Sequence, residues 1–279
     1  MDILGQLIKK TPEFPGKASR LVPFWMSNRD QSSIRQRALS LALSGNMKIS
    51  CDLSVPYEAM VWLEREEEDD LAIIRKLLKP GDVFVDCGAN IGLWSLVAAS
   101  VVGTTGKVFA FEPNPLTFRK LVNNLQHNCN AAISAYNMAL GNKEGTVNFL
   151  CYNEHNISRL AKQEELANST EVEIGSLDQR LLSQAIDGMK IDVEGLELDV
   201  LRGAEKLLKT NYPWICVEFN TLISQVNTLS EWPVHNYLKS LGYQCYQFRF
   251  RSSKGIYSSE PLGDNYQTIG YRNLFYLKK

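Results

Sequence analysis

The sequence predicts an α/β protein whose mostly parallel sheet is covered by helices on both faces. Apolar runs of strand length alternate with amphipathic helical segments between residues 82 and 220, and the connections between them are short. Such alternation is typical of βαβ units, in which parallel strands are buried on both faces. Two further apolar runs, 243–250 and 272–279, are expected to close the sheet as a strand pair.

The composition excludes several classes of protein. The chain has 279 residues, of which 44% are hydrophobic and 22% charged, which is enough for a large core. A net charge of −1 gives no basic field for nucleic acid. The six cysteines include no CxxC pair and are expected to be free thiols. Because the longest apolar run, Leu93 to Val102, is about half of a bilayer span, we expect no transmembrane segment and a soluble, cytoplasmic protein.

Residues 1–60 form an N-terminal extension in this interpretation, and residues 61–279 form the main domain. The extension has weak periodicity and four prolines, which favours short helices and a hairpin. We expect it to pack on the main core. A lid over a pocket, a homodimer surface, a substrate-binding segment and a weak membrane contact are the alternatives.

The first half of the main domain contains clear start and stop signals. Acids begin a helix near residue 64, and Pro80-Gly81 ends it, so the acid run is interpreted as a solvated helix start rather than a metal site. Strand 82–88, helix 90–102, strand 106–113, helix 114–128 and strand 131–140 follow. Asn114 is the expected N-cap of its helix, with Pro115 as the first helical residue.

The second half continues the alternation. We expect short strands at 145–150 and 171–177, a strand at 188–195, a helix at 196–209, a strand at 213–220 and a short helix at 235–242. A polar loop from Ser252 to Gln267 separates the two closing strands, and this loop and the N-terminal extension are expected to select the substrate.

Ligands of such sheets bind at the carboxyl ends of the strands. The first strand ends in Asp86 and a glycine-rich turn, Gly88 to Gly92, that leads into a helix. The turn has the pattern DxGxNxG, which is neither the GxGxxG of dinucleotide sites nor a Walker loop. It therefore favours a ligand with little phosphate.

Glu112 ends the second strand, 26 residues after Asp86, where an acid can accept both hydroxyls of a ribose. These features suit S-adenosylmethionine, with its methionine part near Asp86 and its adenine near the end of the third strand. The candidate cofactor-binding residues are Asp86, Gly88, Ala89, Asn90, Gly92, Glu112, Pro113, Asn137, Ala139 and Asp192.

Several segments together resemble the FkbM-type methyltransferase family. They are VFVDCGANIGLWS, FAFEPNP, NMALGNKEG, MKIDVEGLELDVLRGAEKLL and WICVEFN, in the family's order between about Tyr57 and about Asn220. The resemblance implies a Rossmann-like, seven-stranded methyltransferase sheet with an antiparallel last strand, and S-adenosylmethionine as cofactor. It also implies methylation of a hydroxyl oxygen on a sugar, glycolipid or natural-product metabolite.

The ends of the fourth and fifth strands supply the candidate catalytic residues. Strand alternation points Asp192 toward the pocket, and Glu218 ends the next strand. Either carboxylate can take the proton of an attacking hydroxyl, and Lys190 can orient the acceptor. His155, in a loop, is a further candidate base or else a surface histidine. Asp192 and Glu194 could hold Mg²⁺, but the sequence shows no third ligand, so Mg²⁺ is not expected.

Four other functions remain open at this point. The acceptor could be a nitrogen atom or a protein side chain, which needs less help from a base. A nicotinamide-dependent oxidoreductase can use a similar sheet, although the missing GxGxxG opposes it. A non-catalytic binding protein could retain the fold, although the acids at the strand ends oppose that reading.

Overall fold

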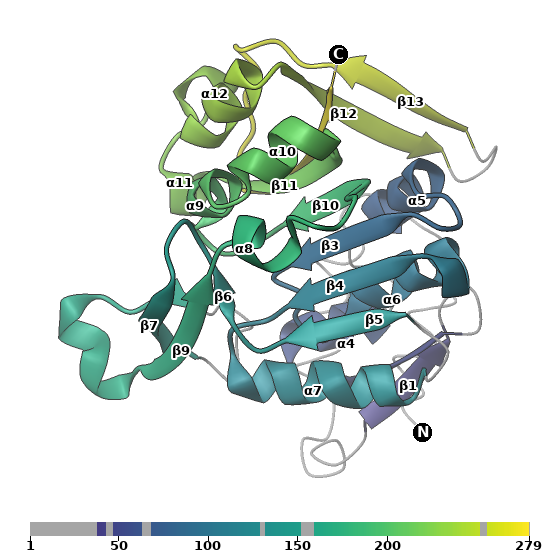
Figure 1. Ribbon diagram of the computed structural model, residues 1–279, viewed down its shortest axis with the longest axis vertical. Coiled ribbons are helices and arrows are strands. Elements are labelled where there is room, and N and C mark those ends of the chain that lie inside the picture. Colours follow the sequence, from purple (N-terminus) through teal and green to yellow (C-terminus); the bar gives the residue numbers. More distant parts are fainter. Residues whose placement is uncertain are drawn as a thin grey trace.

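The computed structural model describes residues 38–42, 47–62, 68–128, 132–151, 159–251 and 256–278. Within this part of the chain, one large sheet runs through the molecule with helices before and behind it (Figure 1). Its strands are β3 (Val83–Cys87), β4 (Lys107–Phe111), β5 (Ile133–Tyr136), β10 (Gly188–Ile191), β11 (Trp214–Asn220), β12 (Tyr243–Arg251), β13 (Ile256–Pro261) and β14 (Tyr271–Lys278).

The strand order is β13-β12-β14-β11-β10-β3-β4-β5. The strands β5, β4, β3, β10 and β11 are parallel, and β14 runs antiparallel to both of its neighbours, β11 and β12. This confirms the expected parallel sheet with an antiparallel last strand. β13 is an eighth strand at the edge, and it lies within the segment that we predicted as a polar loop. That loop prediction was wrong because Ile256 to Pro261 pairs with β12 although half of its side chains are polar.

Helices cover both faces of the sheet, and the strands alternate between two cores. Phe84 and Val108 face the helices α5 (Glu68–Leu77) and α6 (Leu93–Val102), next to which lies α7 (Pro115–Gln126). Val85 and Phe109 face the opposite side. That side is covered by α8 (Leu177–Leu181), α9 (Glu197–Arg202), α10 (Glu205–Asn211) and α12 (Pro233–Ser240). Short 3-10 helices span Gly103–Thr105, Gln163–Asn168 and Leu229–Glu231, and α11 (Thr221–Ser224) follows β11.

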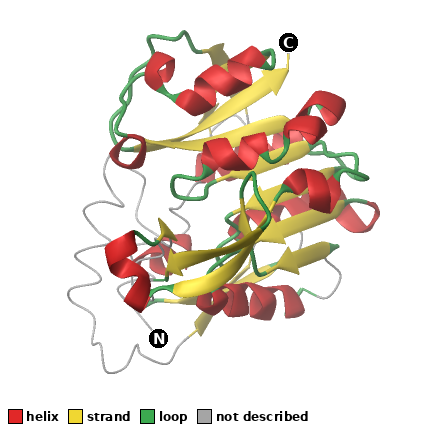
Figure 2. Cartoon of the chain, turned by 60° about the vertical axis from the view of Figure 1, so that its left-hand side comes forward, coloured by secondary structure: helices red, strands yellow, loops and turns green. Residues whose placement is uncertain are grey.

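A second, smaller sheet projects from the side of the molecule (Figures 1 and 2). Its strands are β6 (Ala139–Leu140), β7 (Gly145–Leu150), β8 (Arg159–Leu160) and β9 (Thr170–Gly175), in the order β6-β9-β7-β8. We predicted one strand over 131–140, and this was wrong. The chain leaves the large sheet at Asn137, whose side-chain amide donates to the carbonyls of Glu112 and Pro113 at 2.8 and 3.0 Å.

The helix predicted over 196–209 is divided in two, α9 and α10. Gly203 lies at the break, where a Cβ atom would stand 2.0 Å from the carbonyl oxygen of Gly141. The close approach also lets the amide of Asp178 donate to the carbonyl of Gly203 at 2.8 Å. Tertiary packing here overrides a helical sequence pattern.

The described part of the N-terminal extension is the hairpin of β1 (Ala38–Ala42) and β2 (Lys48–Asp52), followed by α4 (Pro56–Trp62). Two buried asparagines, one in α7 and one just after its end, bind the β2 backbone. Asn124 and Asn128 accept hydrogen bonds from the amides of Ser50 and Lys48, at 2.8 and 2.7 Å. Asn124 also donates to the carbonyl of Ile91, at 2.8 Å, so this hairpin is tied to the glycine-rich turn.

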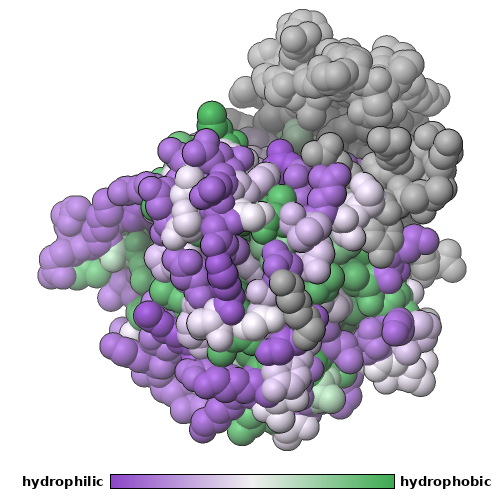
Figure 3. Space-filling view, turned by 90° about the horizontal axis from the view of Figure 1, so that it is seen from above, coloured by the Kyte–Doolittle hydropathy of each residue, from purple (hydrophilic) through white to green (hydrophobic). Residues whose placement is uncertain are grey.

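The surface over the β12–β13 end is mostly hydrophilic, with hydrophobic areas in separate places (Figure 3). Within the described ranges, no helix has the length and apolar character needed to cross a bilayer. The buried cysteines include Cys87 and Cys216 in their strands, and every cysteine of the described ranges is a free thiol.

Candidate active site

The glycine-rich turn is held between the ends of β4 and β10. The amides of Gly88 and Ala89 both donate to the carbonyl of Phe111, at 3.0 and 2.9 Å. Gly88 has a φ of +85°, and a Cβ atom there would lie 1.8 Å from the carbonyl oxygen of Asp192. At Gly92, with a φ of +97°, a Cβ atom would lie 2.7 Å from Leu121. Both glycines are therefore required by the turn's own packing, and not only by the approach of a ligand.

Asp86 lies beneath this turn instead of at the rim where we expected it. Its residue is 0% exposed, and the hydroxyl of Ser95 donates to its Oδ2 at 2.6 Å. Its Oδ1 has no hydrogen-bond partner among the residues that the structure describes. Burial raises the pKa of Asp86, and the charge of Lys190 opposes the rise. Asp86 is buried because it lies inside the sheet, where it pairs with Lys190 of β10 and Ala110 of β4.

Glu112 is held at the end of β4 by two backbone amides. Asn90 donates to its Oε2 and Asn114 to its Oε1, each at 2.9 Å. Burial raises its pKa to about 7 in spite of these hydrogen bonds. Each carboxylate oxygen keeps a further lone pair. Asn114 also caps α7, as expected, by accepting from the amide of Leu116 at 2.9 Å.

A cleft with about 570 Å³ of empty space, part of which is open to solvent, lies beside Glu112. Six of the predicted cofactor residues line it: Gly88, Asn90, Glu112, Pro113, Ala139 and Asp192. The other four do not belong to its lining: Asp86, Ala89, Gly92 and Asn137. The sequence reasoning did not identify most of the apolar lining, which comes from Phe111, Met138, Leu140, Phe149, Val193 and Leu196.

The cleft has the polar atoms that a nucleoside with a polar tail needs. Asn90, whose φ is +50°, has a buried Oδ1 that finds no hydrogen-bond partner in the described part of the chain. Glu112 offers its free lone pairs at the same wall, while Phe149 and Met138 provide apolar surface. An unpaired buried oxygen is costly unless a donor reaches it. The residues present therefore fit a ligand that brings hydroxyl or amine donors.

Three carboxyl groups meet at the carboxyl ends of β10 and β11. Asp192, Glu194 and Glu218 each offer an oxygen, and these oxygens lie within 4.8 Å of one another. We call these three residues the carboxylate cluster. Burial first, and then the neighbouring acids, raise the pKa of Glu194 to about 7 and that of Glu218 to about 9. Glu218 is the third potential ligand for a divalent cation that the sequence did not reveal.

Lys190 supplies a positive charge next to this cluster. Its residue is 4% exposed, and its Nζ lies 3.0 Å from Asp192 Oδ2 and 3.4 Å from the carbonyl oxygen of Gly88. The ammonium also lies 5.3 Å from the centre of the Trp94 ring, where a cation–π interaction is favourable. Lys190 therefore joins the carboxylate cluster to the glycine-rich turn.

A second cavity, of about 630 Å³, lies on the other side of the cluster. Glu218 belongs to its wall, together with Asn220 and Ser224 from the end of β11 and from α11. Its apolar walls are Leu198, Ile223, Trp232, Pro233 and Val234. The cluster thus separates two cavities, with Asp192 and Glu194 on the wall of the first and Glu218 on the wall of the second.

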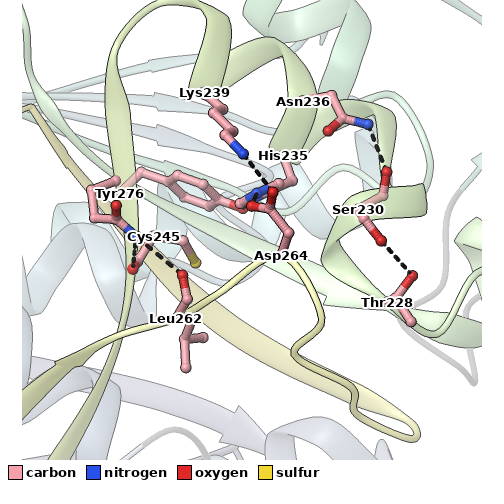
Figure 4. Close-up of polar contacts among 10 residues, drawn as sticks. Thr228, Ser230, His235, Asn236, Lys239, Cys245, Leu262, Asp264 and Tyr276 are labelled. Carbon is pink, nitrogen blue, oxygen red and sulfur yellow. Dashed lines mark hydrogen bonds and ion pairs between the residues drawn. The ribbon is translucent and has the colours of Figure 1, made fainter.

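Two histidines, His155 and His235, are considered as possible site residues. His155 lies outside the described residues, so its candidate role stays a prediction. His235 is buried in α12 and belongs to the lining of neither cavity, with Nδ1 3.1 Å from the Tyr276 hydroxyl and Nε2 3.3 Å from Asp264 Oδ1 (Figure 4). Lys239 binds the other oxygen of Asp264 at 2.5 Å. His235 is therefore a packing residue.

Comparisons with known proteins identify the family of the chain and several relatives. Residues 86–245 match the family model described as the methyltransferase FkbM domain. The chain is 29% identical over 165 residues to the hexuronic acid methyltransferase AglP of Haloferax volcanii, covering 54% of this chain and 62% of that protein. It is 27% identical over 150 residues to Methyltransferase 1 of Beauveria bassiana, covering 45% and 60%. These matches span about three fifths of each relative.

A solved structure with a similar arrangement is the methyltransferase FkbM from Methylobacillus flagellatus. It is 16% identical, with a TM-score of 0.46, over 82% of this chain and 56% of that one. The family model covers more than half of the chain and begins at the acid of the glycine-rich turn. The chain belongs to the FkbM methyltransferase family.

Proposed function

We propose that this protein transfers a methyl group from S-adenosylmethionine to a hydroxyl oxygen of a sugar, glycolipid or natural-product metabolite. The observation that carries the proposal is the position of the carboxylate cluster, between a cleft that suits the cofactor and a second cavity. The family supports methyl transfer, and the sugar-type substrate in the name of one relative supports the acceptor class.

The cofactor is proposed to bind in the 570 Å³ cleft. Glu112 would accept the ribose hydroxyls with the lone pairs that its two backbone amides leave free. The apolar side chains of Met138, Leu140 and Phe149 would surround the adenine. Gly88 and Asp192 line the part of the cleft that is proposed for the methionine end.

S-Adenosylmethionine supplies a methyl group on a positively charged sulfur when it is bound. The chain's own task is to hold the acceptor in line and to take its proton. Transfer to a hydroxyl forms one C–O bond while the C–S bond breaks, and the hydroxyl proton passes to a carboxylate of the chain. Glu218 is the proposed base because it belongs both to the cluster and to the wall of the second cavity. The positive charge of the bound cofactor would lower its raised pKa and so favour the carboxylate form that accepts a proton.

Lys190 is proposed as a positioning residue because it pairs with Asp192 and contacts the turn. A nitrogen or protein acceptor is the second candidate. An amine needs less help from a base, so activity that survives both Asp192→Asn and Glu218→Gln would favour it. A non-catalytic protein would bind the cofactor but turn over no acceptor.

Calorimetric titration with S-adenosylhomocysteine, and separately with NADH, tests the cofactor. We expect the wild type to bind S-adenosylhomocysteine and not NADH, and Glu112→Ala to lose at least about tenfold in affinity, the equivalent of one charge-assisted hydrogen bond or more. Glu173→Ala, an exposed acid of β9, is the matched control and should bind as the wild type does. Binding of NADH, or equal binding by Glu112→Ala, contradicts the proposal.

A further inference from the structure

The second cavity is not a closed chamber, because one of its walls continues onto the surface. Ile223, from α11, lines the cavity and is also 38% exposed. Its neighbour Leu222 is 83% exposed, and two more large residues beside it, Ile269 and Tyr271, are 95% and 62% exposed. We call Leu222, Ile223, Ile269 and Tyr271 the apolar patch.

The members of the apolar patch come from two segments that hydrogen bonds join. The amide of Thr221 donates to the carbonyl of Gly270 at 2.8 Å, and the amide of Gly270 donates to the Thr221 hydroxyl at 3.0 Å. Ile269 and Tyr271 flank Gly270, and Leu222 follows Thr221. The four side chains therefore belong to one place on the surface.

The segment that carries Ile269 is fixed along its length. The amide of Ser230 donates to the carbonyl of Asp264 at 2.9 Å, and the Asp264 side chain binds His235 and Lys239 (Figure 4). The amide of Leu229 donates to the carbonyl of Tyr266 at 3.2 Å. A loop that is held in this way keeps its apolar side chains in water at a cost, which is typical of binding surfaces.

The second cavity and the apolar patch differ in chemistry, and together they suit two parts of one molecule. The cavity combines apolar walls with the carboxyl groups of Glu197 and Glu218 and the amide of Asn220, which can bind hydroxyl groups. The patch offers the aliphatic side chains of Leu222, Ile223 and Ile269 and the aromatic ring of Tyr271, whose hydroxyl is its polar group. A ligand with its polar part at Glu218 would have to leave the cavity past Ile223 and cross the patch.

We propose that the second cavity binds the hydroxyl-bearing end of the methyl acceptor and that the apolar patch binds an apolar chain of the same molecule. The acceptor is therefore amphipathic, with an uncharged polar head and an aliphatic tail. This inference rests on the proposed function, since it assumes that Glu218 faces the reacting oxygen. It goes further by assigning a tail-binding surface to Leu222, Ile223, Ile269 and Tyr271.

A series of alkyl β-D-glucopyranosides with methyl, butyl, hexyl and octyl chains tests the inference. Binding to the full chain, saturated with S-adenosylhomocysteine, is measured by ligand-observed NMR below each critical micelle concentration. We expect affinity to rise with chain length, by roughly tenfold or more from methyl to hexyl, since each buried CH₂ favours binding. The variant Leu222→Ser/Ile269→Ser should lose most of this gain, and Leu182→Ser, an exposed leucine after α8, should keep it.

The outcomes separate this inference from the proposed function. Wild type and variants should bind S-adenosylhomocysteine equally, and loss of that binding in the wild type refutes the proposed function itself. Affinity that does not depend on chain length, absence of binding by any glycoside, or chain-length dependence that persists in Leu222→Ser/Ile269→Ser overturns the inference. So does sedimentation that shows these substitutions to dissociate a dimer, since a second copy would then be the occupant of the patch.

Discussion

The ammonium of Lys190 donates a hydrogen bond to Asp192 Oδ2 at 3.0 Å, at the carboxyl end of β10. The pair lies among acids whose pKa values burial raises, and the lysine's charge opposes the rise at Asp86, Glu112, Glu194 and Glu218. One buried ammonium therefore limits the protonation of the whole site, which is a stronger role than the orientation of an acceptor that the sequence predicted for it.

Replacement of this lysine should change the titration of acids that it does not touch. In Lys190→Met, we expect the pKa of Glu112 to rise above its value of about 7, by roughly one pH unit for a lost neighbouring charge. The measurement is NMR titration of glutamate side-chain carboxyl carbons. Lys239→Met, which removes a lysine paired with Asp264 outside the cleft, is the control. An unchanged Glu112 titration in Lys190→Met would show that the lysine has no electrostatic role here.

The close contact at Gly88 predicts that a larger residue there destabilises the protein, and Gly103 provides a matched control. In Gly88→Ala, the new Cβ atom would meet the Asp192 carbonyl oxygen at 1.8 Å, so the turn and the end of β10 must move apart. We expect stability to fall by about 3 kcal/mol or more and S-adenosylhomocysteine binding to be lost. Denaturant unfolding and calorimetry measure the two effects.

Gly103 has a similar φ of +68°, but apart from its chain neighbours no atom of the described residues lies within 4 Å of a Cβ atom there. Gly103→Ala should therefore cost only about 1–2 kcal/mol, from backbone strain alone, and leave ligand binding intact. Equal losses in the two variants would mean that positive φ, and not the contact with Asp192, is the reason for glycine at position 88.

The burial of His235 leads to a prediction of how the free energy of unfolding changes with pH. Burial lowers its pKa from the ordinary value, although Asp264 favours the charged form. The folded state therefore binds this proton less readily than the unfolded chain, so its contribution to stability is present at neutral pH and falls as the pH drops through the unfolded pKa of about 6.5. In His235→Phe this loss between pH 7 and pH 5 should be absent.

The measurement is the difference in unfolding free energy between wild type and His235→Phe across that range. His127→Phe, at an exposed position after α7, is the control and should follow the wild type. A difference that stays constant with pH would show that His235 does not titrate on unfolding.

The sequence predicted the parts of the site that follow from local order along the chain. Glu112 and Asp192 end strands, and the ends of parallel strands meet at one edge, so their approach was predictable. Glycine at positions 88 and 92 marks a turn for the same local reason. The predicted family and the parallel sheet with its antiparallel last strand are both confirmed.

Features that depend on long-range packing could not be predicted in this way. The chain bends at Asn137, where the side-chain amide donates hydrogen bonds to the backbone carbonyls of Glu112 and Pro113, 25 and 24 residues earlier. Phe149 reaches the cleft only because that bend creates a second sheet. Asp86 differs from the other acids because it is buried and because the hydroxyl of Ser95, 9 residues later in α6, donates a hydrogen bond to its Oδ2. Strand patterns carry no information on such contacts.

The carboxylate cluster should distinguish the charged cofactor from the neutral product. A positive charge that binds beside Glu194 and Glu218 lowers their raised pKa values, so protons leave the protein. At pH 8 we expect S-adenosylmethionine to release more protons than S-adenosylhomocysteine, as measured by calorimetry in buffers with different ionisation enthalpies. Glu173→Gln should behave as the wild type does. Equal proton release by the two ligands would contradict a role for the cluster in charge recognition.

Glu218 itself should make the protein less stable at high pH. Its pKa is about 9 in the folded state and about 4.3 in an unfolded chain. The group's favourable contribution is complete below the unfolded value and is lost as the pH rises through the folded value, because folding then requires proton uptake or a buried charge. In Glu218→Gln this penalty is absent.

We therefore expect Glu218→Gln to be more stable than the wild type at pH 8 by about 1–3 kcal/mol, after allowance for the partial exposure of the side chain. The two proteins should have equal stability at pH 4, and the variant should lose methyl transfer to a hydroxyl. Denaturant unfolding at both pH values measures the difference, with Glu173→Gln as control. A variant that is less stable than the wild type at pH 8 would mean that Glu218 makes favourable contacts as a carboxylate, and that the cluster is held together by more than the packing around it.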